Sequence, residues 1–217
     1  MHCFQRLATA ALLCLLASTA HARGPQASGD APGVFDFYVL SLSWSPSWCL
    51  AHPQDTQQCS GKGYGFVLHG LWPQFANNRW PQFCAPLTPL SAAERAKGMS
   101  LFPSPQLMAH EWAKHGTCSG LGAEGYLRAT DAALARVKIP PALEPSARAQ
   151  RLPARQIKAL FQQANPALPE GGIAVYCNRN QLSEVRVCLS KDLSPISCGA
   201  PLKGQCQQND VLVPGVR

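Results

Sequence analysis

The sequence has 217 residues, of which 46% are hydrophobic, and its formal net charge is +7. This length is enough for one domain with its own hydrophobic core, and after residue 22 no segment is apolar for long enough to cross a bilayer, which excludes a membrane-spanning chain. The positive charge favours polyanionic partners, although a mild basic excess is common and does not identify one.

Residues 1–22 have the pattern of a secretory signal. Arg6 supplies the positive start, an apolar run follows over 7–20, and residues 20–22 (Ala-His-Ala) fit the small-x-small cleavage rule. We therefore expect a mature chain that begins at Arg23 and is periplasmic or secreted. No membrane contact is expected once the signal has been removed.

Residues 23–33 are rich in Gly, Pro, Ala and Ser, which predicts a flexible leader before a single domain over 34–217. Ten cysteines are present, of which Cys3 and Cys14 lie in the predicted signal. An even number of remaining cysteines in an exported chain predicts four disulfides. A zinc site is disfavoured because no Cys-x-x-Cys occurs and the spacings are wide. The residues alone leave the connectivity open among the mature cysteines, which are Cys49, Cys59, Cys84, Cys118, Cys177, Cys188, Cys198 and Cys206.

The first half of the domain contains two predicted strands. Residues 35–44 alternate between two apolar faces, which predicts a strand buried on both sides. Residues 45–62 carry Pro, Ser and Gly and predict a loop. A second strand is predicted over 63–71. The Pro-rich stretch 73–103 predicts an irregular segment with at most one helical turn, around 91–97.

The second half contains three predicted helices and two strands. Residues 105–115 predict a helix that begins after a capping serine and stops before a glycine. A second helix is predicted over 123–137, and a third between the prolines that bound 153–166. Strands are predicted over 173–177 and 184–189. The fold class is therefore α+β, an antiparallel sheet with packed helices.

The helix over 105–115 carries an unusual group of ionisable residues. On a helical wheel of roughly 100° per residue they fall within an arc of roughly 140°. They are His110, Glu111, Lys114 and His115. The other side of the helix has apolar residues that can pack into the core, namely Ala109, Trp112 and Ala113. The preceding strand brings a further histidine, His69, near its end.

Several common active sites do not fit these residues. A zinc protease would need His-Glu-x-x-His, whereas His110 and His115 are five positions apart. No Gly-x-Ser-x-Gly marks a serine nucleophile, and every mature cysteine has a plausible oxidised partner. A phosphate-ester hydrolase of another type would need a metal cluster or a nucleophile, and the sequence shows neither. The remaining set suits a substrate with its own nucleophile, such as the 2′-hydroxyl of RNA.

The two histidine segments, His-Gly-Leu-Trp-Pro at 69–73 and His-Glu-Trp-Ala-Lys-His-Gly-Thr-Cys at 110–118, resemble the catalytic segments of the ribonuclease T2 family. Residues 37–44 are similar to that family's first strand, and 173–206 resemble its C-terminal region. The resemblance thus extends over nearly the whole mature chain. The absence of Asn-x-Ser/Thr and the short alanine-rich signal favour a bacterial member.

The resemblance implies catalytic roles for residues of both segments. His69 is expected to be the general acid of the transesterification step and His115 the general base, with the roles exchanged when the cyclic phosphate is hydrolysed. Glu111 and Lys114 are expected to stabilise the phosphorane-like state, and Glu111 also to orient an imidazole. No cofactor and no metal are implied.

Substrate contacts follow from the same resemblance. His110 is expected to hold phosphate, and Trp72 to stack on a base unless it is a core tryptophan. The remaining tryptophans are expected to be structural: Trp44, Trp48, Trp80 and Trp112. Many family members have an acidic residue where Gln74 stands, and Phe-Trp where Leu107 and Met108 stand. We therefore expect a weak base preference.

The resemblance also implies a disulfide pairing and a function. The implied pairs are Cys49–Cys59, Cys84–Cys118, Cys177–Cys206 and Cys188–Cys198. The expected function is an exported, monomeric endoribonuclease that cleaves single-stranded RNA without a metal, through a 2′,3′-cyclic phosphate to 3′-phosphate ends. The alternative is a secreted binding or toxin-like scaffold that has kept the fold and lost activity. Loss of either His69 or His115 would favour the scaffold, and both are present.

Overall fold

The computed structural model describes residues 29–199 and 202–216. The predicted signal at 1–22 and most of the predicted leader lie outside the described residues. The described end of the leader reaches the domain at Gly33, whose backbone N–H donates to the carbonyl of Cys118 at 2.9 Å. In the described ranges no helix is both long and apolar enough to span a membrane.

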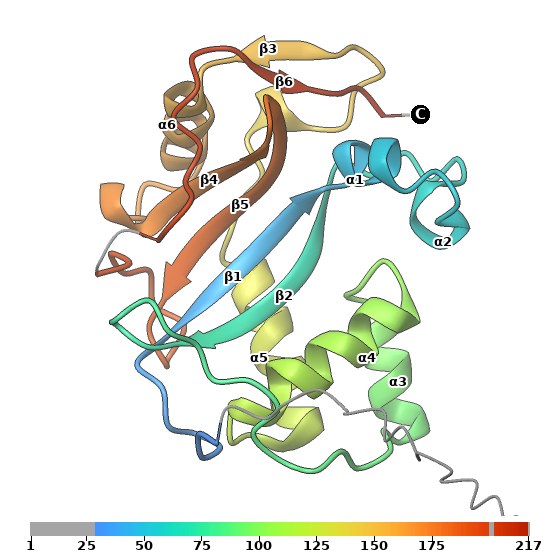
Figure 1. The fold of residues 1–217 in the computed structure, drawn as a ribbon, viewed down its shortest axis with the longest axis vertical. Helices are drawn as coiled ribbons and strands as arrows, with labels where there is room; N and C mark the ends of the chain where they lie inside the picture. Colours follow the sequence, from blue (N-terminus) through green and yellow to red (C-terminus); the bar gives the residue numbers. More distant parts are fainter. Residues whose placement is uncertain (1–28, 200–201, 217) are drawn as a thin grey trace, which may run out of the picture.

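One twisted sheet runs through the centre of the molecule (Figure 1). Its strands are β1 (Phe37–Trp44), β2 (Phe66–Gln74), β3 (Gln150–Leu152), β4 (Ile173–Asn178), β5 (Gln181–Leu189) and β6 (Val211–Val213). The strand order is β2-β1-β5-β6-β3, and β4 pairs with β5 outside this path. The described neighbours are antiparallel except β5 and β6, which pair in parallel at Gln181 and Leu212.

The helices lie around this sheet in separate groups. They are α1 (Ser45–Ala51), α2 (Thr56–Cys59), α3 (Ala92–Met99), α4 (Pro105–Lys114), α5 (Gly122–Ala135) and α6 (Ala154–Ala164), with 3₁₀ turns at Gly116–Cys118, Pro141–Leu143 and Glu170–Gly172. Figure 1 shows α3, α4 and α5 gathered at one end of the molecule, near β1 and β2, whereas α6 lies beside β4. The arrangement confirms the predicted α+β class.

Two helices occupy the stretch 45–62, which the sequence predicts to be a loop. In α1, Pro46 stands in the first turn, where a proline breaks no hydrogen bond. In α2, the side chain of Asp55 caps the helix by accepting the N–H of Gln58 at 3.1 Å. The loop prediction is wrong because the same residue types that favour turns also begin helices.

The other differences from the predicted elements concern their ends and the short strands. α3 extends over two turns rather than one, because Ser91 and Glu94 form a complete capping box at its start. β2 begins and ends three residues later than predicted, at Phe66 and Gln74. The three-residue strands β3 and β6 pair with each other and have too few residues for a periodic signal.

The sheet separates two apolar clusters. The larger cluster includes alternate residues of β1 and β5, together with two leucines of β2: Tyr38, Leu40, Leu42, Val185, Val187, Leu189, Leu68 and Leu71. The opposite face carries a smaller cluster with Phe37, Val39, Trp72, Ala174 and Cys188. The prediction that the first strand is buried on both sides is thus confirmed. Each fully buried leucine contributes about 1.5–3 kcal/mol.

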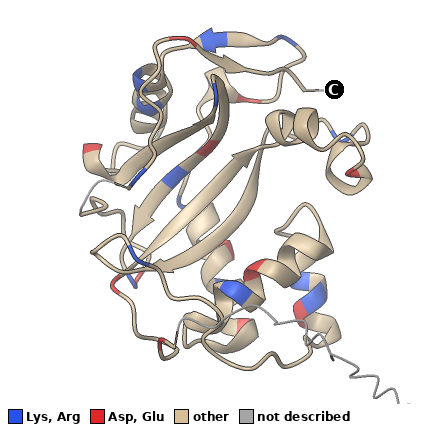
Figure 2. Ribbon diagram, viewed as in Figure 1, with Lys and Arg blue, Asp and Glu red and all other residues tan. Residues whose placement is uncertain are grey.

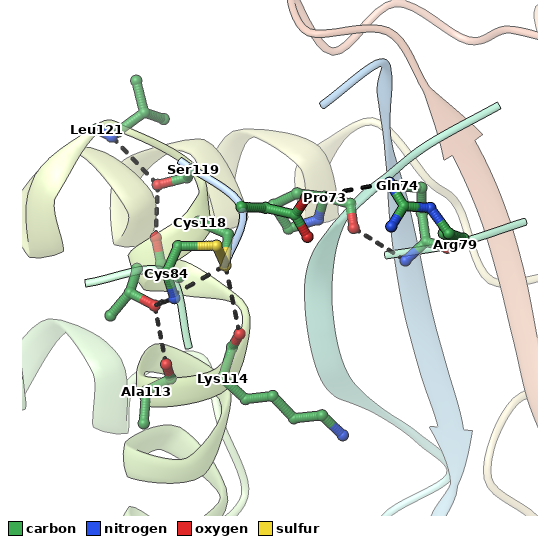
Figure 3. The surroundings of a disulfide bond; sticks show 12 residues. Pro73, Gln74, Arg79, Cys84, Ala113, Lys114, Cys118, Ser119 and Leu121 are labelled. Carbon is green, nitrogen blue, oxygen red and sulfur yellow. Dashed lines mark hydrogen bonds and ion pairs between the residues drawn. A yellow bond between two sulfur atoms is a disulfide. The ribbon is translucent and has the colours of Figure 1, made fainter. Parts of the chain in front are cut away.

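Four disulfides join the described cysteines in the implied pairs, Cys49–Cys59, Cys84–Cys118, Cys177–Cys206 and Cys188–Cys198. Figure 3 shows the bridge between Cys84 and Cys118, with Ala113 close to it. The hydroxyl of Thr117 accepts the N–H of Cys84 at 3.2 Å and donates to the carbonyl of Ala113 at 2.9 Å. This bridge therefore fastens the long loop after β2 to the C-terminal end of α4.

Candidate active site

A β-bulge places His69. In the pairing of β1 with β2, Ser41 lies opposite Gly70 and Leu42 lies opposite Leu68, so His69 is the extra residue. Bulges of this kind re-aim a side chain. In a regular strand, residues three apart point to opposite faces. Here the rings of His69 and Trp72 meet with their centroids 5.0 Å apart.

α4 turns a partly polar face toward the sheet. Ser104 caps the helix by accepting the N–H of Leu107 at 3.1 Å, as the sequence predicts. The buried side of the helix consists of Met108, Glu111 and Trp112, with His115 at the helix end. Ala109 is exposed, so the expectation that it packs into the core is wrong. The side of α4 that faces the sheet carries Glu111 instead, because its carboxylate contacts Trp72 and His69 of β2.

Glu111 is a buried carboxylate with only 1% of its surface exposed. Its Oε2 accepts the indole N–H of Trp72 at 2.5 Å, and its Oε1 lies 3.7 Å from Nε2 of His69. Burial raises the pKa of Glu111, although His69, Trp72 and Lys114 act in the opposite direction. The carboxylate lies so close to β2 that a Cβ at Gly70 would come within 2.1 Å of its Oε2.

The other ring nitrogen of His69 contacts a residue of β5. Its Nδ1 lies 2.6 Å from Oε1 of Glu184, whose Oε2 accepts from Arg186 Nε at 2.8 Å. Figure 2 shows the acidic and basic positions next to each other on β5. Burial acts to lower the pKa of His69, but the hydrogen bond and charge of Glu184, with the charge of Glu111, outweigh it and raise this pKa above the ordinary 6.5. Burial acts to raise the pKa of Glu184, but the contacts of this carboxylate with His69 and Arg186 outweigh burial and lower the pKa to about 2.

His115 has the opposite electrostatic environment. It is 5% exposed, and its Nδ1 has no hydrogen-bond partner among the described residues. Burial is the largest cause that lowers its pKa well below 6.5, and the positive charges of Lys114 and the neighbouring histidines add to it. Its ring lies 5.2 Å from that of Trp72. Trp72 therefore lies close to both histidines, one of which favours the charged form and the other the neutral form.

All six predicted site residues line one cleft of about 390 Å³. The cleft is lined by Val39, His69, Trp72, Gln74, Asn78, Trp80, His110, Glu111, Lys114, His115, Tyr176, Arg186, Leu202 and Lys203. His110 is exposed and Lys114 is half-buried. Figure 3 shows the Lys114 side chain extending from the end of α4. No group of three or more His, Cys, Asp or Glu in the described ranges is arranged to hold a metal ion.

The sequence did not identify four residues in or beside this cleft: Tyr176, Trp80, Glu184 and Arg186. The guanidinium of Arg186 lies 3.9 Å from the ring centroid of Tyr176 and 4.8 Å from that of Trp72. The sequence signal that could have indicated Glu184 and Arg186 is the alternation of β5, which places both residues on the face opposite its valines. The expectation that Trp80 is structural is not met, because it is 49% exposed and lines the cleft.

The sequence and the fold of this chain are similar to those of known ribonucleases. The model of the Ribonuclease T2 family matches residues 35–198. A ribonuclease of Aeromonas hydrophila is 36% identical over 95% of this chain and 97% of that protein. A probable ribonuclease of Haemophilus influenzae is 28% identical over 78% of this chain and 63% of that protein. The crystal structure of RNase NT in complex with 5′-AMP is 27% identical, with a TM-score of 0.63 over 83% of this chain and 98% of that chain.

The chain therefore belongs to the ribonuclease T2 family. The prediction of a T2-type endoribonuclease is confirmed at this level. The roles of the individual cleft residues stay predictions.

Proposed function

We propose that this chain is an exported endoribonuclease that cleaves single-stranded RNA without a metal, through a 2′,3′-cyclic phosphate to 3′-phosphate ends. The observation that carries the proposal is that His69 and His115 line one cleft, with both rings close to Trp72. The directions of their pKa shifts, upward for His69 and downward for His115, support it. An acid must hold its proton and a base must lack one at the same pH. His69 is therefore the general acid and His115 the general base of the first step, and they exchange roles in the second.

The remaining cleft residues have supporting roles in this proposal. Lys114 stabilises the charge that develops on the phosphate oxygens, and the exposed His110 holds phosphate at the cleft edge. Glu111 orients His69 from its Nε2 side and stabilises the crowded intermediate. Trp72 is the base-stacking surface, together with the more exposed Trp80.

Export and nucleotide binding have separate support. Four disulfides are typical of an oxidising compartment such as the periplasm or the extracellular medium. RNase NT was solved in complex with 5′-AMP and a mutant of RNase MC1 in complex with 5′-GMP, so structurally similar proteins bind nucleotides. In the cleft of this chain, Gln74 offers a neutral amide whose nitrogen donates to the carbonyl of Pro73 at 3.0 Å. A weak base preference is proposed on this ground.

The test is cleavage of defined oligonucleotides by the purified mature protein in EDTA. RNA should give 2′,3′-cyclic ends and later 3′-phosphates, whereas DNA and RNA methylated at the 2′ oxygen should stay uncut. His69→Ala and His115→Ala should each lower turnover by at least ~10²-fold. His52→Ala is the matched control, because His52 stacks on Trp48 outside the cleft. Cleavage that needs a divalent ion would refute the mechanism, and a folded protein that cuts no RNA would favour the scaffold alternative.

A further inference from the structure

We propose that Glu184, held by Arg186, is the positioning residue of the general acid His69. This inference rests on the proposed function, because it explains how the sheet prepares His69 for proton donation. Glu184 lies on β5, and neither histidine segment includes it. Its carboxylate fixes one nitrogen of the imidazole and leaves the other for substrate.

The contact of His69 with Glu184 determines which way the ring faces. Nδ1 lies 2.6 Å from Oε1 of Glu184, which is the geometry of an N–H that donates to a carboxylate. The ring can then offer only Nε2, the atom that lies 3.7 Å from Glu111 on the cleft side. A carboxylate behind an imidazole selects the tautomer, fixes the ring and stabilises the charged form.

Glu184 is itself held firmly. Its Oε2 accepts from Nε of Arg186 at 2.8 Å and lies 2.6 Å from Nη2 of the same side chain. The guanidinium thus binds Oε2 through two nitrogens and leaves Oε1 free to contact His69. The carboxylate side chain is only 13% exposed. Arg186 is packed in turn against the rings of Tyr176 and Trp72. Arg186 therefore contacts both Glu184, which supports the proposed acid, and Trp72, the proposed base-stacking surface.

The contact depends on small residues in the strand between the two partners. β1 separates β2 from β5, and strands two apart in a sheet are separated by roughly 9–10 Å. Side chains of β2 and β5 can meet over β1 only where β1 carries little bulk. On that face β1 presents Ser41, which pairs with Gly70 on one side and Arg186 on the other, and Ser43, which pairs with Glu184. The larger residues of that face of β1 come before position 41.

The charges around His69 come from two elements. Glu184 and Arg186 face it from β5, and Glu111 faces it from α4, with the imidazoles of His110 and His115 further along the cleft. Neutralising Glu184 removes the anion in direct contact and leaves Arg186 unpaired. Both changes disfavour the proton on His69.

The experiment compares Glu184→Gln, Glu184→Asp and the wild-type protein across pH. Gln keeps the size of the side chain and removes its charge, so the alkaline limb of kcat/KM should move to lower pH by about one unit or more. The NMR titration of the His69 ring should move equally. Asp keeps the charge, so its alkaline limb should stay nearer that of the wild type, while its shorter reach lowers kcat more than it changes KM. Glu124→Gln is the matched control, because Glu124 is an exposed carboxylate on α5.

The outcomes separate this inference from the function on which it rests. An unmoved alkaline limb and an unmoved His69 titration in Glu184→Gln would overturn it, even if RNA cleavage and the loss in His69→Ala are as proposed. An equal shift in Glu124→Gln would also overturn it, because the effect would then be one of net charge. If Glu184→Gln does not fold, the wild-type titration decides, since His69 must titrate above 6.5 and above His110 and His115. A wild-type protein that fails to make cyclic phosphate would refute the function, whereas the NMR result needs no RNA.

Discussion

Position 70 of β2 has room for a hydrogen and nothing larger. A Cβ there would come within 2.1 Å of Oε2 of Glu111 and 2.5 Å of Nε1 of Trp72, and ordinary contact begins near 3.4 Å. In Gly70→Ala the buried carboxylate must therefore move by more than an ångström. It would lose the hydrogen bond from Trp72 and change its distance to His69.

The cost of this change has two parts. Overpacking a well-packed site costs about 1–3 kcal/mol, and a buried hydrogen bond to a charged group contributes about 1.5–3 kcal/mol. Gly70→Ala should therefore lower the free energy of unfolding by about 2.5–6 kcal/mol, as measured by urea denaturation. Displacement of Glu111 by an ångström should lower kcat by roughly 10²-fold in the fully folded variant.

A matched variant and a mutant cycle test the reasoning. Gly171→Ala makes the same chemical change on an exposed 3₁₀ turn, where the nearest atoms lie 3.2 Å away on Ser197, and should leave kcat unchanged. In a Glu111→Ala background the main obstacle is gone, so the destabilisation by Gly70→Ala should shrink. A Gly70→Ala protein with wild-type stability and turnover would show that the carboxylate is not held where the structure places it.

Three further predictions concern pH, the bridge and base choice. First, as pH increases, kcat/KM should rise where His115 loses its proton, below pH 6.5, and should fall where His69 loses its proton, above pH 6.5. A fall in kcat/KM that begins below pH 6.5 would contradict the assigned roles. Second, replacing Cys84 and Cys118 by alanine should lower the free energy of unfolding, measured in urea, by about 2–5 kcal/mol. At temperatures where the variant is still folded, kcat should also fall, because the end of α4 is released. An unchanged kcat would show that the bridge contributes to stability alone. Third, Gln74→Glu should widen the ratio of kcat/KM among the four homopolymers by about fivefold, and an unchanged ratio would place base selection elsewhere.

The sequence predicts most of the elements that carry the cleft, because their signals are local. Ser104, with a proline after it, defines the start of α4, and the helical period brings Glu111 and His115 to neighbouring positions. The alternation of β1 correctly predicts that both of its faces are buried. These local signals account for His110, Glu111, Lys114 and His115, whereas the bulge in β2 brings His69 and Trp72 to the same cleft.

The parts that the sequence does not predict depend on contacts between distant segments. The alternation of β5 places Glu184 on the face opposite Val185, but only the strand order shows that this face reaches His69. A helical wheel likewise groups Glu111 with polar neighbours. It cannot show that this carboxylate is buried, because its hydrogen-bond donor, Trp72, comes from another element.

The bulge at His69 shows what transfer of this site to another protein would require. The strand changes phase at that point, so Leu68 and Leu71 both enter the core while His69 and Trp72 share the cleft. Copying the residues His-Gly-Leu-Trp onto a regular strand would turn either the imidazole or the indole away, since a shift of one residue reverses the face of every side chain. Transfer of His69 as a general acid to another protein must therefore include the irregular backbone of the bulge as well as the residues. For the same reason, deletion of one residue here should be far more damaging than deletion of one residue in an exposed loop.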